Sequence, residues 1–120
     1  MSTDARLQET SAEYQKLHSD LAILVEKRTR LDTQLSENEM VKKEFASLTP
    51  NNTVYKLVGP VLVLQDQNEA KGNVETRLGF IQGEIKRVDN QIKDMEEKAE
   101  RKKVELVEMQ SKIEQVQSRS

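Results

Sequence analysis

Thr53-Val-Tyr-Lys-Leu-Val-Gly-Pro-Val-Leu-Val-Leu-Gln65 is the stretch of sequence that decides the fold. Two runs of β-branched and large apolar residues flank Gly59-Pro60 within it, and that pattern predicts a β-hairpin in a connector at residues 49–66. Gly59 suits the first central position of a tight turn, whereas Pro60 beside it is less usual. The sequence therefore leaves the turn type open.

The predicted hairpin is apolar on both faces. Alternation places Val54 and Val58 on one face and Tyr55 and Leu57 on the other, and residues 61–64 are apolar without a break. A lone two-stranded hairpin is marginal in water, and its two unpaired edges invite other strands. We therefore expect hairpins of other subunits to complete it in an obligate oligomer; the alternative is a hairpin folded back on its own helices. The residues expected to make the assembly contact are Val54, Tyr55, Leu57, Val58, Val61, Leu62, Val63 and Leu64.

Two long segments without proline flank this connector, because both prolines lie inside it. Each segment has a stripe of residues at alternating spacings of three and four, the heptad seam of a left-handed coiled coil. The first seam is Leu7, Thr10, Tyr14, Leu17, Leu21, Leu24, Arg28, Leu31 and Leu35. The second seam is Val74, Leu78, Ile81, Ile85, Val88, Ile92, Met95, Ala99, Lys102, Leu106, Met109, Ile113 and Val116. We predict a mainly α fold: helices at residues 4–48 and 67–117 form a long antiparallel two-helix coiled coil with a single central β-hairpin.

The two seams can be matched in one antiparallel register. If Leu7 faces Val116, paired positions add to 123 along the whole seam, and every seam residue of the first helix faces one of the second. A shift by a whole heptad preserves the same pattern, so that alternative stays open. Two seam residues, Arg28 and Lys102, are cations whose aliphatic stems can still pack against the partner helix.

Local signals predict where the helices end and begin. Pro50 disfavours helical backbone at the residue before it, so the first helix should end near Leu48. Asp66, followed three residues later by Glu69, can form a capping box that opens the second helix.

Two features depart from a simple coiled coil. Val41, Phe45 and Leu48 form an apolar patch rotated away from the first seam, and we expect something other than the intrachain seam to cover it. Gly79 and Gly83 lie inside the second helix, off the seam, and each costs about 1 kcal/mol relative to Ala. They are either tolerated on the surface or allow a neighbouring chain to approach closely.

The composition excludes several classes of protein. Of the 120 residues, 33% are charged and 35% hydrophobic, so we expect one domain, residues 1–120, without a deep globular core. The 19 basic and 21 acidic residues nearly balance, which argues against a nucleic-acid partner. The N-terminus does not resemble a signal peptide, and no apolar run approaches the ~20 residues of a membrane helix. We therefore expect no membrane partner and a cytoplasmic location.

Enzymatic chemistry is not expected. The sequence has no Cys, and His18 is its only histidine, so one chain can assemble neither a catalytic triad nor a zinc site. No glycine-rich loop followed by Lys and Ser or Thr is present to hold nucleotide phosphates. We predict a protein that is not an enzyme, with no catalytic, metal-binding or cofactor-binding residues and no cofactor.

The hairpin and its flanking motifs resemble those of prefoldin. The hairpin is preceded by Gln34-Leu-Ser-Glu-Asn38 and Val41-Lys-Lys-Glu-Phe45 and followed by Arg77-Leu-Gly-Phe-Ile81. With these motifs the chain resembles a eukaryotic β-class prefoldin subunit over nearly its whole length, the single hairpin marking the β class. The resemblance implies a heterohexamer of two α-class and four β-class subunits joined through their hairpins. It also implies a co-chaperone that binds unfolded actin and tubulin without ATP and passes them to the cytosolic group II chaperonin.

The ends of the coiled coil are the predicted client-binding sites. Coil ends lack neighbours on one side and open at low free-energy cost, and several weak sites can bind one unfolded chain together. The seam residues that opening would expose are Leu7, Tyr14, Leu17, Leu106, Met109, Ile113 and Val116. These residues either bind clients or only hold the two helices of the coiled coil together. The alternative function is a structural coiled-coil scaffold or tether, which has no need for a hairpin with two apolar faces.

Overall fold

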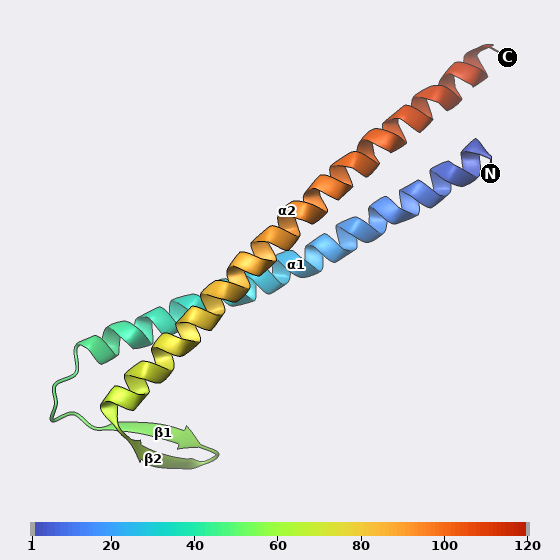
Figure 1. Cartoon of the computed structure of the whole chain (residues 1–120). Coiled ribbons are helices and arrows are strands. Elements are labelled where there is room, and N and C mark those ends of the chain that lie inside the picture. The colour runs from blue at the N-terminus through green and yellow to red at the C-terminus, as the bar shows by residue number, and fades with distance from the viewer. Residues whose placement is uncertain (1, 120) are drawn as a thin grey trace. The chain divides into compact units, whose positions relative to one another are not determined.

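The computed structural model describes residues 2–119 as two long helices with a hairpin between them (Figure 1). The elements are α1 (Thr3–Ala46), β1 (Val54–Val58), β2 (Val61–Gln65) and α2 (Gln67–Arg119). The predicted mainly α fold with a single hairpin is confirmed, and both helices begin and end within two residues of the predicted spans. The predicted domain also included Met1 and Ser120, which lie outside the described residues.

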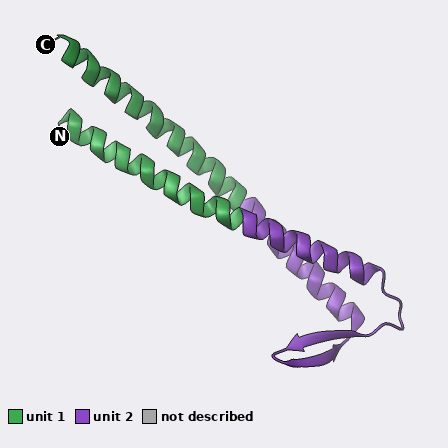
Figure 2. Ribbon diagram, turned by 180° about the vertical axis from the view of Figure 1, so that it is seen from behind, with its two compact units in different colours: residues 1–28, 88–120 green, residues 29–87 purple. Residues whose placement is uncertain are grey.

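The chain divides into two compact units (Figure 2). Residues 1–28 and 88–120, the terminal unit, contain the start of α1 and most of α2. Residues 29–87, the hairpin unit, contain the end of α1, both strands and the start of α2. In each unit the two helical segments run antiparallel (Figures 1 and 2), as the heptad pattern predicts.

The start of α1 is fixed by a side-chain cap. The hydroxyl oxygen of Ser2 accepts a hydrogen bond from the backbone N–H of Ala5 at 3.1 Å, which satisfies a donor that has no partner within the helix. At the other end α1 stops at Ala46, two residues before the predicted position. The backbone N–H of Ser47 bonds to the carbonyl of Glu44 at 3.1 Å, a tighter turn of the kind that often ends a helix.

The hairpin pairs its strands around a two-residue turn. Val58 pairs with Val61 beside the turn, and Val54 pairs with Gln65 at the other end. Gly59 has a φ of 58°, a left-handed value that glycine adopts without steric cost, while Pro60 fixes its own φ at about −65°. A positive φ at the first central position alone is typical of the type II′ turn, whose twist matches that of the strands.

Hydrogen bonds join the connector to the start of α2. Asp66 accepts a bond from the backbone N–H of Glu69 at 3.0 Å, so the predicted N-cap is present. The side-chain amide of Gln67 donates to the carbonyls of Thr49 and Asn52 at 2.9 and 3.3 Å. The segment that leaves α1 is thereby held against the residue that begins α2, which fixes where the hairpin starts within its unit.

The core of each unit is the helical seam. In the hairpin unit the buried residues are Leu31, Ala70, Val74, Leu78 and Ile81. In the terminal unit they are Thr10, Val88 and Ala99, and most other seam positions there are half-buried. Within residues 2–119, neither helix is apolar enough over a sufficient length to cross a membrane.

Candidate functional site

The hairpin exposes large apolar side chains on one of its faces. Two cross-strand pairs lie there, Tyr55 opposite Leu64 and Leu57 opposite Leu62. Leu57 is 67% exposed and Leu64 is 65% exposed. A face of this kind loses its contact with water only when another protein surface covers it, and burying each such side chain contributes roughly 1.5–3 kcal/mol.

The other face of the hairpin is also uncovered. Val58 and Val61 lie opposite each other and are exposed, and so is Val63, while Val54 is half-buried. The sheet has two strands only, so each strand has one open edge. All eight residues predicted to make the assembly contact therefore lie on one small sheet, and seven of them are exposed. The alternative prediction, a hairpin packed on the chain's own helices, is wrong for the single chain.

The predicted client-binding residues lie together in the terminal unit. The start of α1 and the end of α2 are neighbours there (Figure 1), and Thr3 and Asp4 line one hollow with Ile113 and Val116. Six of the seven are half-buried along the seam; they are Leu7, Tyr14, Leu17, Leu106, Met109 and Ile113. Val116 differs, because it is 69% exposed.

The helical register differs from the predicted one by a heptad. In the terminal unit Glu13 contacts Lys102, and in the hairpin unit Lys42 contacts Glu75. These positions add to 115 and 117, whereas the predicted register requires 123. The pairing of Leu7 with Val116 is therefore wrong, and the whole-heptad shift that the sequence left open is the register adopted.

Charges beside the seam give a physical reason for this register. The predicted register would place Lys27 opposite Lys98, because both positions flank the seam on the same side. In the structure Lys98 instead shares a groove with Asp20. In this register Thr3, the first residue of α1, lies level with Ile113, so Val116 lies one step further along α2 than the start of α1.

Both seam cations are held by carboxylates within the terminal unit. Arg28 Nε lies 2.7 Å from Asp89 Oδ1. Lys102 Nζ lies 2.7 Å from Glu13 Oε2 and 3.6 Å from Glu105 Oε2. The hydrogen bond to Glu13 raises the pKa of Lys102 above its ordinary value, and the charge of Glu105 adds to that effect against the cost of desolvation. The aliphatic stems of these two residues thus occupy the seam while carboxylates hold their charges.

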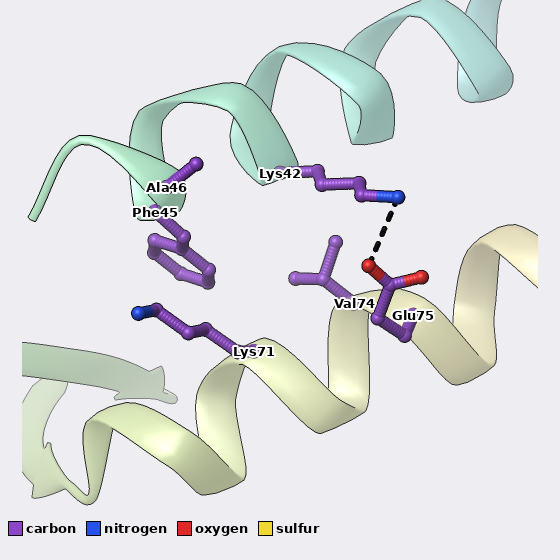
Figure 3. A pocket seen from close by; sticks show the side chains of 6 residues that line it. All are labelled: Lys42, Phe45, Ala46, Lys71, Val74 and Glu75. Atoms are coloured by element: carbon purple, nitrogen blue, oxygen red, sulfur yellow. Dashed lines mark ion pairs between the residues drawn. The ribbon is translucent and has the colours of Figure 1, made fainter.

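One residue of the rotated patch at the end of α1, Phe45, lines a hollow beside α2. Figure 3 shows the Phe45 ring beside the side chains of Lys71 and Val74, with Ala46 above it. Lys42 Nζ bonds to Glu75 Oε1 at 3.0 Å across the same hollow, whose volume is about 250 Å³. Phe45 lines this hollow together with the seam residue Val74 and is half-buried, so the expectation that something other than the intrachain seam covers the patch stays a prediction.

Side chains that could bind a metal ion are not clustered in the described part of the chain. Across residues 2–119 no three His, Cys, Asp or Glu side chains are placed to hold a metal ion. His18 lies edge-on to the Tyr14 ring, with 4.5 Å between ring centroids, one helical turn away on α1. His18 therefore packs against a neighbouring aromatic side chain on the surface of α1.

Sequence reasoning missed one exposed aromatic residue. Phe80 is 69% exposed on α2 in the hairpin unit, next to Gly79. The signal was present in the sequence, because a phenylalanine between two off-seam glycines is unusual on the solvent face of a charged coiled coil.

Comparison with known proteins identifies the family. The prefoldin subunit family matches residues 8–113. The chain belongs to the prefoldin subunit family. Prefoldin subunit 6 of Homo sapiens is 40% identical over 113 residues, which cover 94% of this chain and 88% of the human protein. Prefoldin subunit 6 of Saccharomyces cerevisiae is 41% identical over 103 residues, which cover 86% of this chain and 90% of the yeast protein.

Solved prefoldin structures share the fold. The crystal structure of the prefoldin beta subunit from Thermococcus strain KS-1 matches with a TM-score of 0.79 at 19% identity, over 84% of this chain and 89% of that one. The predicted resemblance to prefoldin is thus confirmed, and the fold is that of a prefoldin beta subunit. The chain is a subunit of the prefoldin co-chaperone, and its family implies assembly with other prefoldin subunits. Prefoldin subunits are non-enzymatic co-chaperones.

Proposed function

We propose that the chain is one of four β-class subunits that join two α-class subunits in a cytoplasmic heterohexamer through their hairpins. The ends of its coiled coil bind unfolded or nascent polypeptides such as actin and tubulin without ATP. The hexamer then delivers these clients to the cytosolic group II chaperonin. The observation that carries the proposal is a hairpin exposed on both faces in a chain that belongs to the prefoldin family.

The hairpin supports assembly because it is incomplete in the single chain. Its side chains Leu57, Leu62 and Leu64 expose more than half of their surface, and both strands have an open edge. Strands from neighbouring subunits would pair with those edges and cover the apolar faces in one step. A scaffold or tether would gain nothing from such a sheet.

The terminal unit supports client binding because its apolar residues are only partly covered. Val116 is exposed, and Ile113, Met109 and Leu7 are half-buried near the helix ends. Methionine adapts to irregular apolar partners. Each subunit offers a small binding area, and several subunits acting on one unfolded chain raise its affinity by effective concentration.

Reconstitution with the other prefoldin subunits tests assembly. The double variant Leu57→Ser/Leu62→Ser removes one apolar pair from the sheet, and we expect native mass measurement to find no hexamer. Ile23→Ser is the matched control, because Ile23 is 61% exposed on α1 in the terminal unit. A hexamer that forms normally with the hairpin variant would contradict the proposal.

Suppression of client aggregation by the assembled hexamer tests the binding site. The variant with Leu7, Leu17, Leu106 and Ile113 changed to Ser should capture unfolded actin more weakly, once its assembly is verified. Val116→Ser is the milder variant, because the residue is already exposed and its replacement should leave stability within about 0.5 kcal/mol. Val107→Ser is the control on the side of α2 away from the seam. Unchanged capture by the fourfold variant would rule out this site.

A further inference from the structure

One face of α2 in the hairpin unit lies outside the seam and lacks the charged residues that are typical of a solvent-exposed helix face. It consists of Gly72, Thr76, Gly79, Phe80 and Gly83, all exposed, and we call it the glycine–phenylalanine face. These positions fall on the side of the helix opposite the buried seam residues, because they occupy heptad positions b, c and f when the seam occupies a and d. Nothing in the hairpin unit covers Phe80, which is 69% exposed.

The charge pattern separates this face from the rest of α2. Between residues 72 and 87 the side opposite the seam carries no carboxylate, only Lys86 and Arg87 at its end. The two glutamates of that segment flank the seam and are already paired, Glu75 with Lys42 at 3.0 Å and Glu84 with Arg87 at 2.6 Å. In the terminal unit the same side of α2 carries Asp94, Glu97, Glu100, Glu108 and Glu114. Helix faces that stay in water are normally charged, so the loss of carboxylates indicates a face that is covered.

The glycines fit close approach by another backbone. A Cβ added at Gly79 or Gly83 would meet no atom within 4 Å, so nothing inside the chain requires glycine at these positions. Both lie in the helix with ordinary helical φ, where Ala would give a more stable helix. Glycines on a helix surface allow another molecule to approach the helix closely. Phe80 lies beside them, and aromatic residues are enriched at protein interfaces.

We propose that a neighbouring prefoldin subunit covers the glycine–phenylalanine face, with an apolar segment against Phe80 and a carboxylate near Lys86. This inference rests on the proposed assembly through the hairpin. Strand β2 leads into α2 through Asp66 alone, and the face begins at Gly72, seven residues after the last strand residue, Gln65. Each then extends about 17 Å, from a strand of five residues and from eleven helical steps. A subunit docked on the sheet therefore has a second contact of matching length within the same compact unit.

The decisive experiment makes stability and assembly change in opposite directions. Gly79→Ala/Gly83→Ala should raise the melting temperature of the purified chain by a few degrees, about 4 °C per residue, because Ala is the better helix former. In reconstitution with the other prefoldin subunits, the same variant should weaken hexamer formation on the order of ten-fold, because the added methyl groups hold the neighbour away. Phe80→Ala should weaken hexamer formation similarly and leave the melting temperature unchanged.

Two controls distinguish this inference from the proposed function. Val107→Ala replaces a residue that is 58% exposed on the same side of α2 in the terminal unit, and we expect no change in assembly. Leu57→Ser/Leu62→Ser should abolish assembly. If the hairpin variant fails to assemble while the glycine and Phe80 variants assemble as wild type, the inference is wrong and the proposed function stands. If the hairpin variant assembles normally, the proposed function itself fails.

Other occupants of the face give different results and would overturn the inference. A client site predicts that Phe80→Ala hexamers form normally but suppress actin aggregation less well. A contact with a second copy of this chain predicts that the purified chain alone is a dimer in sedimentation and that Phe80→Ala makes it a monomer. The proposal requires neither result.

Discussion

The hairpin unit and the terminal unit use the same helical repeat in opposite ways. In the hairpin unit the seam is closed, with Val74, Leu78 and Ile81 buried, and the exposed apolar surface lies elsewhere, on the sheet and at Phe80. In the terminal unit most of the seam is half-buried and Val116 at its end is exposed, while the outward sides of the helices carry charged residues together with exposed apolar ones such as Ile23 and Val107. A single pattern of spacings therefore gives a closed seam in one unit and a mostly half-buried seam in the other.

This difference follows from where each unit can find partners. In the hairpin unit, paired strands and a capped helix hold the exposed side chains in place, which suits the proposed assembly interface. The terminal unit ends in helix termini, which open at low free-energy cost. Permanent interfaces need fixed geometry, whereas binding to unfolded chains of varied sequence benefits from side chains that can rearrange. The hairpin unit is thus suited to the proposed assembly, and the terminal unit is suited to the proposed binding of clients.

The largest expected effect tests whether the terminal unit keeps the register found in the structure. The sequence has no cysteine, so an introduced pair reports on register without interference. In the observed register Leu17 and Ala99 lie in one layer of the seam, and Leu17→Cys/Ala99→Cys should oxidise to a disulfide almost completely. Leu24→Cys/Ala99→Cys, which belongs to the predicted register, should not, because such a bond needs Cα atoms within about 7 Å. The measurement is the fraction of free thiol after mild oxidation of the assembled protein. A disulfide in the second pair alone would show that the terminal unit has slipped by a heptad.

The second prediction compares the two seams by their stability. Ile81→Ala removes a side chain that is 3% exposed and should lower the free energy of unfolding by about 2–5 kcal/mol. Ile113→Ala, in the terminal unit, should cost less than about 1 kcal/mol, because its side chain is half in water already. Urea unfolding of the full chain, followed by helical circular dichroism, measures both. Equal losses would show that the seam is uniformly closed and would remove the physical basis for binding at the helix ends.

Most of the fold could be predicted from local pattern, and the rest depends on longer-range choices. The heptad spacings gave both helices, and the run around Gly59 gave the hairpin, because periodicity and turn chemistry act over a few residues. The register could not be predicted, since a shift of seven residues restores every apolar pairing and only flanking charges such as Lys98 distinguish the alternatives. The hydrogen bond from Gln67 to the carbonyl of Thr49 was not predicted either, because it joins residues that are 18 positions apart in the chain.

The candidate surfaces were predicted unevenly for the same reason. Residues of the hairpin could be named in advance because a strand exposes two faces whatever its partner. The uncovered state of Val116 depends on register, and the significance of Phe80 depends on seeing that nothing in the hairpin unit packs on it.

The smallest expected effect is a pH dependence of stability that comes from the ion pair between Lys102 and Glu13 in the terminal unit. Lys102 bonds to Glu13, and that bond raises the pKa of the Lys102 ammonium in the folded chain. A raised pKa means that folding favours the protonated lysine, so the stabilisation is fully present below the pKa of the unfolded chain. It is lost as pH rises through the higher pKa of the folded chain. Unfolding experiments should therefore show a stability difference between wild type and Lys102→Met that is constant near neutral pH and changes only in the alkaline range.

The sign of that change separates the pair from the packing of the lysine stem. Methionine keeps most of the apolar stem and removes the charge, so the wild type should lose stability relative to Lys102→Met as pH rises through the alkaline range. Lys103→Met is the control, because Lys103 is exposed and makes no ion pair in the described part of the chain, and it should keep the pH dependence of the wild type. A pH-independent difference for Lys102→Met would mean that the lysine acts only through its stem. The helices of the terminal unit would then depend on apolar contacts and on the pair between Arg28 and Asp89.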